Sequence, residues 1–226
     1  MTNLIKLEPL RKAESPATPP LLDVRGLTVW VGLRTVCREI SVSLHKGEVL
    51  RLEIGGDDLV LVTGPNGSGK SSLLNAIAGL APARIEAGTV NIKGHDVTKW
   101  PAHRRCALGL AYMRQRDNVF SDLTVEDNLT IALGVRGPRI FADSFGGRAA
   151  SMFGKRAEVL SGGERQILAW AMSLLREGDL LLADEPEGGL AGKVELPRDK
   201  ACLLVSHSMD RLWEKTDSTE WRTYVD

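Results

Sequence analysis

A glycine-rich segment at residues 64–71 constrains this chain more than any other feature. Its sequence, Gly64-Pro65-Asn66-Gly67-Ser68-Gly69-Lys70-Ser71, fits the pattern G-x-x-x-x-G-K-[ST] of the phosphate-binding P-loop. A short apolar run typical of a strand precedes it at 59–62, and residues 71–79 predict a helix that ends at a glycine. An incidental glycine-rich turn is the alternative, but the strand before it and the helix after it favour a true P-loop.

The physical chemistry of this pattern is specific. Glycines let the backbone turn tightly, so that successive N–H groups point into one hollow of anion size. The helix that follows adds unpaired N–H groups and the positive end of its dipole. Lys70 can then reach the β- and γ-phosphates, and the hydroxyl of Ser71 can reach a divalent metal. Ser72, the next residue, is also a candidate for nucleotide binding. The segment therefore predicts a nucleoside triphosphate bound together with a metal ion.

Composition narrows the class of protein further. The chain has 226 residues, enough for one domain or for a domain with a subdomain. Basic and acidic residues both number 29, so net charge gives no reason to expect nucleic acid as a partner. Three distant cysteines lack metal-binding spacing, which predicts buried free thiols. No apolar run approaches the roughly 20 residues that span a bilayer, and the N-terminus has no signal-peptide pattern. We expect a cytoplasmic chain whose membrane link comes through a partner.

The order of patterns along the chain predicts an α/β fold. Residues 1–20 contain four prolines among charged residues and predict a flexible leader. Strand patterns at 27–30, 40–44 and 49–54 predict an antiparallel region, and further strands are expected at 88–92 and 110–113. Helices are expected at 125–133 and 164–176, with less regular structure up to 157. The apolar runs at 180–183 and 202–205 predict parallel strands buried on both faces.

A second motif identifies a resemblance. The run Leu160-Ser161-Gly162-Gly163-Glu164-Arg165-Gln166 is similar to the signature motif of ATP-binding subunits of ABC transporters, and the resemblance extends from residue 22 to 208. It implies a P-loop NTPase core with a mainly parallel sheet, an N-terminal antiparallel β subdomain and a helical subdomain at about 116–172. Together these would form one domain at 21–226. The stretches 115–129 and 187–191 resemble branched-chain amino acid and urea importers.

The resemblance also implies roles for individual residues. Asp184, at the end of an apolar run, matches the carboxylate that holds Mg²⁺ together with Ser71, and Glu185 matches the acid that accepts a proton from the attacking water. Gln115 matches the glutamine that contacts both metal and water, and His207 matches the histidine that contacts the γ-phosphate. The alternatives are acids that cap a helix, a solvated loop glutamine and a structural histidine.

Two further expectations concern the nucleotide and its surroundings. Trp30 is the candidate for stacking on adenine, since the family uses an aromatic residue upstream of the P-loop and no other aromatic residue lies between Trp30 and Gly64, 34 positions further on. A core tryptophan is the alternative. Ser161, Gly162 and Gly163 open a helix, and in the family they bind the γ-phosphate of ATP held by the opposite subunit. The resemblance therefore implies a dimer of ATP-binding subunits, homomeric or heteromeric, with transmembrane permease subunits as partners.

These observations favour an Mg²⁺-dependent ATPase that powers transport across a membrane. A soluble ABC ATPase outside transport is a second hypothesis, although the paired cassettes, coiled-coil inserts or basic extensions common in such proteins are not evident. A third is a nucleotide-dependent binding module with impaired hydrolysis. It is motivated by the short connection of 22 positions from Glu185 to His207 and by the short segment after His207.

Overall fold

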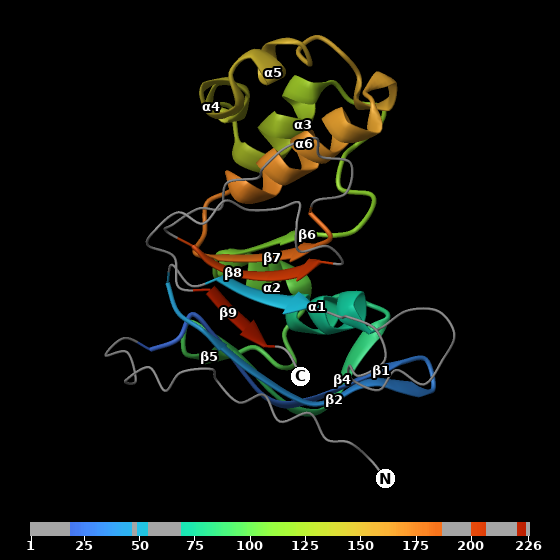
Figure 1. The fold of residues 1–226 in the computed structure, drawn as a ribbon, viewed down its shortest axis with the longest axis vertical. Coiled ribbons are helices and arrows are strands. Elements are labelled where there is room, and N and C mark those ends of the chain that lie inside the picture. Colours follow the sequence, from blue (N-terminus) through green and yellow to red (C-terminus); the bar gives the residue numbers. More distant parts are fainter. Residues whose placement is uncertain (1–18, 47–48, 54–68, 187–199, 207–220, 225–226) are drawn as a thin grey trace.

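The computed structural model describes residues 19–46, 49–53, 69–186, 200–206 and 221–224. Figure 1 shows three tiers: an antiparallel sheet at one end, a parallel sheet in the middle and a group of helices at the other end. The strands are β1 (Leu22–Val31), β2 (Arg34–Leu44), β3 (Val49–Glu53), β4 (Ala83–Ile92), β5 (His95–Asp96), β6 (Leu110–Met113), β7 (Leu180–Asp184), β8 (Ala201–Ser206) and β9 (Trp221–Tyr224). The helices are α1 (Lys70–Ala78), α2 (Ala102–Ala107), α3 (Val125–Leu133), α4 (Gly137–Phe145), α5 (Gly147–Ala150), the 3₁₀ turn η1 (Ala157–Val159) and α6 (Gly162–Leu174).

Two sheets organise the described residues. The antiparallel sheet has the strand order β2-β1-β4-β5, and a two-residue turn at Gly32-Leu33 joins its first two strands. The parallel sheet has the order β6-β7-β8-β3-β9. Helix α1 packs against strands of both sheets, so it lies between them. The predicted strands at 110–113, 180–183 and 202–205 are confirmed as neighbours in the parallel sheet.

Strand β3 corrects the predicted antiparallel region. Residues 49–53 pair in parallel with β8 and β9 and lie between them, whereas the sequence pattern placed 49–54 with the antiparallel strands. The physical reason is that a short strand pattern does not encode its partner. Residues 202–206, which provide the pairing edge, lie far along the chain.

Alternation along β7 divides the core into two layers. Leu180 and Leu182 face α1 and the antiparallel sheet, while Leu181 and Ala183 face the other way, toward Trp170 of α6. All five residues of β7 are buried, as the continuous apolar run predicted. The parallel sheet is therefore covered on both faces, which fixes α1 on one side and α6 on the other.

The helices α3 to α6 have an apolar core of their own. Val125, Leu129, Phe141 and Leu168 are fully buried within it. Helix α3 matches the predicted helix at 125–133 residue for residue, because Thr124 caps its N-terminus through the N–H of Asp127. Of the three cysteines, Cys37 and Cys202 are buried free thiols as predicted, whereas Cys106 is partly exposed.

Candidate nucleotide site

The start of α1 has the features of an anion-binding helix terminus. Gly69 occupies the N-cap position with φ 76°, and none of the described side chains caps the helix. This left-handed backbone favours glycine, and an uncapped N-terminus leaves N–H groups for a ligand. Lys70 is only 7% exposed, and no acidic residue lies in the first turn. Ser71 and Ser72 follow in the same turn, while predicted residues 64–68 of the P-loop lie outside the described residues.

The opposite end of α1 confirms the predicted glycine stop. Gly79 has φ 75°, and its N–H donates to the carbonyl of Ala76. The N–H of Leu80 donates to the carbonyl of Asn75 at 2.8 Å, which completes a glycine C-cap. Helix α1 is therefore a short element that begins and ends at left-handed glycines.

The carboxyl ends of β6 and β7 bring three predicted site residues together. These strands run in parallel with Met113 opposite Ala183, so Gln115 and Glu185 follow at the same edge of the sheet. The Gln115 amide Nε2 donates to Glu185 Oε2 at 2.9 Å. Asp184, the last residue of β7, is 1% exposed. Burial, together with the Asp184 carboxylate on the neighbouring strand, raises the pKa of Tyr112 on β6.

The signature segment forms a tightly capped helix start. Ser161 is the N-cap of α6, and its hydroxyl accepts from the N–H of Glu164 at 3.2 Å, while the Glu164 carboxylate accepts from the N–H of Ser161 at 2.8 Å. The Ser161 N–H and the Ser161 hydroxyl lower the pKa of the Glu164 carboxyl through hydrogen bonding, and Lys155 lies 3.6 Å from this carboxylate. Arg165 donates to the carbonyl of Leu160 at 2.7 Å. The first turn, which contains Gly162 and Gly163, is thus held in one conformation.

Two contacts near the site involve residues that the sequence prediction did not assign. The Gln166 amide Nε2 donates to the carbonyls of Glu185 at 3.4 Å and Pro186 at 3.2 Å, which ties α6 to the end of β7. The position of Gln166 as the last residue of the signature run could have indicated this contact from the sequence. The thiol of Cys37 on β2 donates to the carbonyl of Gly69 at 3.5 Å, a contact between distant segments that no local pattern indicates.

The roles of two further predicted residues stay predictions. Trp30 lies on β1, paired with Thr35 and Arg84, and is half-buried. Its indole N–H is buried with no hydrogen-bond partner among the described residues, and nothing there places it against a nucleotide, so its role stays a prediction. His207 lies outside the described residues.

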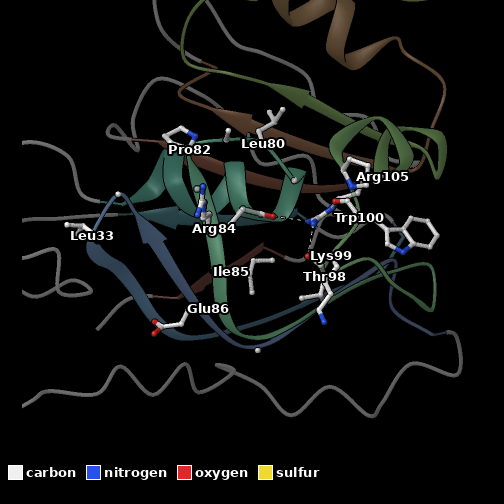
Figure 2. Close-up of a pocket in the computed structure, with 17 residues that line it drawn as sticks. Leu33, Leu80, Pro82, Arg84, Ile85, Glu86, Thr98, Lys99, Trp100 and Arg105 are labelled. Atoms are coloured by element: carbon white, nitrogen blue, oxygen red, sulfur yellow. Dashed lines mark hydrogen bonds between the residues drawn. The ribbon is translucent and has the colours of Figure 1, made fainter.

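A groove of about 1020 Å³ lies elsewhere, beside the C-terminal end of α1. Figure 2 shows Leu80, Pro82, Trp100 and Arg105 among its lining residues. None of the predicted site residues lines it. The groove is therefore separate from the candidate phosphate site at the N-terminal end of the same helix.

The described residues contain no group of three or more histidine, cysteine or acidic side chains that could hold a metal by themselves. Mg²⁺ is commonly held by one or two carboxylates, with phosphate and water oxygens completing its shell, so the buried Asp184 and the hydroxyl of Ser71 suit it. Among the residues that the structure describes, no helix has the length and apolar character needed to cross a membrane.

Comparison with known proteins places the chain in a family. The family model described as ABC transporter matches residues 38–188. A probable branched-chain amino acid transport ATP-binding protein, LivF, of Archaeoglobus fulgidus is 40% identical over 184 residues, covering 74% of this chain and 77% of that protein. An uncharacterised ABC transporter ATP-binding protein of Rhizobium meliloti is 34% identical over 176 residues, covering 75% of this chain and 61% of that protein.

Solved structures agree with these relatives in fold. A nucleotide-free ATP-binding cassette from an ABC transporter superposes with a TM-score of 0.66 at 20% identity, covering 85% of this chain and 83% of that one. The ADP conformation of MJ1267, an ATP-binding cassette of an ABC transporter, gives the same TM-score at 21% identity and the same coverage.

These chains share a P-loop NTPase α/β fold, which is the class defined by the parallel sheet and the helix α1 described above. The chain belongs to the ABC transporter family, as one of its ATP-binding subunits, and it is an ATPase that powers transport. The family, the fold class and the transport-coupled ATPase activity predicted from the sequence are confirmed. The soluble ABC ATPase outside transport is not supported by these relatives.

Proposed function

We propose that the phosphates of Mg–ATP bind at residues 64–71, against the N-terminus of α1. The support within the described residues is the uncapped helix start after Gly69 and the buried Lys70. Ser72, which lies in the same first turn as Lys70, is part of this proposed nucleotide site. Trp30 is the proposed adenine contact, and its position in β1 is the sole support for this role. The binding domain spans 21–226, with a leader at 1–20 and a helical subdomain at about 116–172.

Glu185 is the general base in this proposal, and the observation that carries it is the hydrogen bond from Gln115 to Glu185. A side chain that touches both Glu185 and a water next to it can orient that water for proton transfer. Asp184, Ser71 and Gln115 would hold Mg²⁺, and His207 would contact the γ-phosphate. When bound, Mg²⁺ neutralises charge on the β- and γ-phosphates.

The signature helix serves the nucleotide of a second subunit. Ser161, Gly162 and Gly163 form a preordered helix start, which the capping box between Ser161 and Glu164 holds in place. Two ATP molecules are then enclosed between two ATP-binding subunits, and hydrolysis depends on closure of the pair.

Transmembrane permease subunits are the membrane partners in this proposal, and the chain is cytoplasmic and peripheral at the inner face of the membrane. Of the six large apolar residues that are exposed among the described ones, five lie between residues 120 and 159, in the helical region: Phe120, Ile131, Val135, Ile140 and Val159. Exposed apolar side chains of this kind suit a protein contact.

The name of the Archaeoglobus fulgidus relative supports branched-chain amino acids as the transported class.

The test compares ATP hydrolysis by the full chain, purified with the membrane protein that accompanies it, in three forms. Glu185→Gln should lower kcat by at least about 100-fold, the contribution of a positioned general base, while ATP binding remains. Glu177→Gln, which changes an exposed acid just beyond α6, is the matched control and should keep wild-type activity. Equal rates for all three forms would remove Glu185 from the catalytic role.

The module with impaired hydrolysis remains the second candidate, favoured by the 22 positions between Glu185 and His207. The same assay separates the two. An impaired module would bind ATP and associate in its presence, yet the wild-type chain would release no phosphate above the Glu185→Gln level.

A further inference from the structure

The backbone of Glu185 has an unusual conformation that needs an explanation. Its φ is 51°, in the left-handed region that residues with a Cβ rarely occupy. Such conformations persist at functional sites only where the surrounding structure holds them in place. Since the carboxylate of Glu185 meets Gln115 at 2.9 Å in this conformation, whatever holds the backbone also aims the side chain.

Two sets of hydrogen bonds hold this turn from opposite sides. The N–H of Glu185 donates to the carbonyl of Val205 at 2.8 Å, which continues the pairing of β7 with β8. On the other side, the Gln166 amide donates to the carbonyls of both Glu185 and Pro186. Val205 anchors the turn to the sheet, whereas Gln166 anchors it to a different element, the signature helix.

We infer that Gln166 is a positioning residue that couples the signature helix to the candidate catalytic carboxylate of the same chain. Gln166 lies one helical turn or so beyond the N-cap Ser161, on the helix whose start is locked by the capping box. A shift of this helix start therefore changes the position of the Gln166 amide, and with it the Glu185 turn. This inference rests on the proposed role of Glu185 and adds a residue outside the predicted site.

The variant Gln166→Met removes both donors and keeps a side chain of similar length. If Gln166 acts by placing Glu185, kcat should fall about ten-fold, the size expected from losing one or two ordinary hydrogen bonds, while KM for ATP stays within about two-fold. Ser173→Ala is the matched control, since that hydroxyl lies on the same helix and donates to the carbonyl of Ala169 within it. It should leave both constants unchanged.

The double variant Gln166→Met with Glu185→Gln separates positioning from general damage. Because a positioning residue acts through Glu185, the double variant should hydrolyse ATP as slowly as Glu185→Gln alone and no slower, measured in a single-turnover assay. Additive losses, or a wild-type kcat for Gln166→Met while Glu185→Gln is inactive, would overturn the inference alone. Wild-type activity of Glu185→Gln would overturn the proposed catalytic role as well, so the two failures are distinguishable.

Discussion

Replacing Arg105 by methionine should destabilise the fold by about 3–5 kcal/mol. Its side chain, on α2, is 2% exposed. The guanidinium donates to the carbonyls of Ala76 and Ile77 at 2.8 Å each, of Trp100 at 2.9 Å and of Thr98 at 3.0 Å. Figure 2 shows this side chain reaching from α2 toward the end of α1. One cation thus satisfies the C-terminal carbonyls of α1 and the loop before α2.

The magnitude follows from these four contacts. An ordinary hydrogen bond contributes about 1 kcal/mol net, so four give about 4 kcal/mol. Leaving four carbonyls without their donor raises the cost, whereas removing a buried charge lowers it. Burial lowers the pKa of Arg105 to about 10, so the guanidinium still carries its charge at neutral pH and the carbonyls offset much of its desolvation.

Urea unfolding of the full chain provides the measurement, with the midpoint falling and the slope unchanged. Arg104→Met, the exposed neighbour on α2, is the control and should change stability by less than about 0.5 kcal/mol. Arg105→Lys should remain strongly destabilised, since a single ammonium cannot reach all four carbonyls on two separate segments. A loss below about 1 kcal/mol for Arg105→Met, or one equal to that of Arg104→Met, would refute the reasoning.

Three further outcomes are expected in the same unfolding assay. Gly79→Ala should cost about 1–3 kcal/mol, because φ is 75° and the added Cβ would lie 2.9 Å from the carbonyl oxygen of Trp100; wild-type stability would contradict this. Asn128→Leu should cost about 2–3 kcal/mol, because this fully buried amide bonds both backbone groups of Phe120 at 2.7 and 3.0 Å; a change within error would contradict it. Burial raises the pKa of the Cys37 thiol from 9.0 to about 11, so this thiol ionises at a lower pH in the unfolded chain than in the folded one. The free energy of unfolding of the wild type, relative to that of Cys37→Ala, should therefore decline between pH 9 and 11. A difference that stays constant over this pH range would contradict the prediction.

Elements set by local patterns were predictable from the sequence. The continuous apolar run at 180–183 could only be a strand covered on both faces, and it is one. The apolar residues expected on one side of the helix at 164–176 do pack together in the helical core: Ile167, Leu168, Met172 and Leu175. The unbroken apolar run carries the information in the first case and the helical spacing of the apolar residues in the second, because burial acts residue by residue.

Features that depend on distant segments were not predictable in this way. The pattern at 49–53 indicated a strand, but its parallel pairing with β8 depends on residues some 150 positions away. Arg105 looked like one of several basic residues in a short helix, and only the approach of α1 buries it. The candidate site was predictable in part. The family resemblance identified Gln115 and Glu185, but the hydrogen bond between them could be seen only in the folded structure.

The hydrophobic layer between the parallel sheet and α6 determines how precisely the candidate site is held. Trp170 and Ala169 of α6 pack against Leu181 and Ala183 of β7. The two helix residues lie about one turn beyond Gln166, and Ala183 lies two positions before Glu185. Because close-packed side chains fix the spacing of the elements that carry them, this layer sets the distance that the Gln166 amide must bridge. Its bond to Glu185 is already long at 3.4 Å, so a small displacement of α6 would break it. The chemistry at the sheet edge therefore depends on core packing as much as on the polar residues themselves.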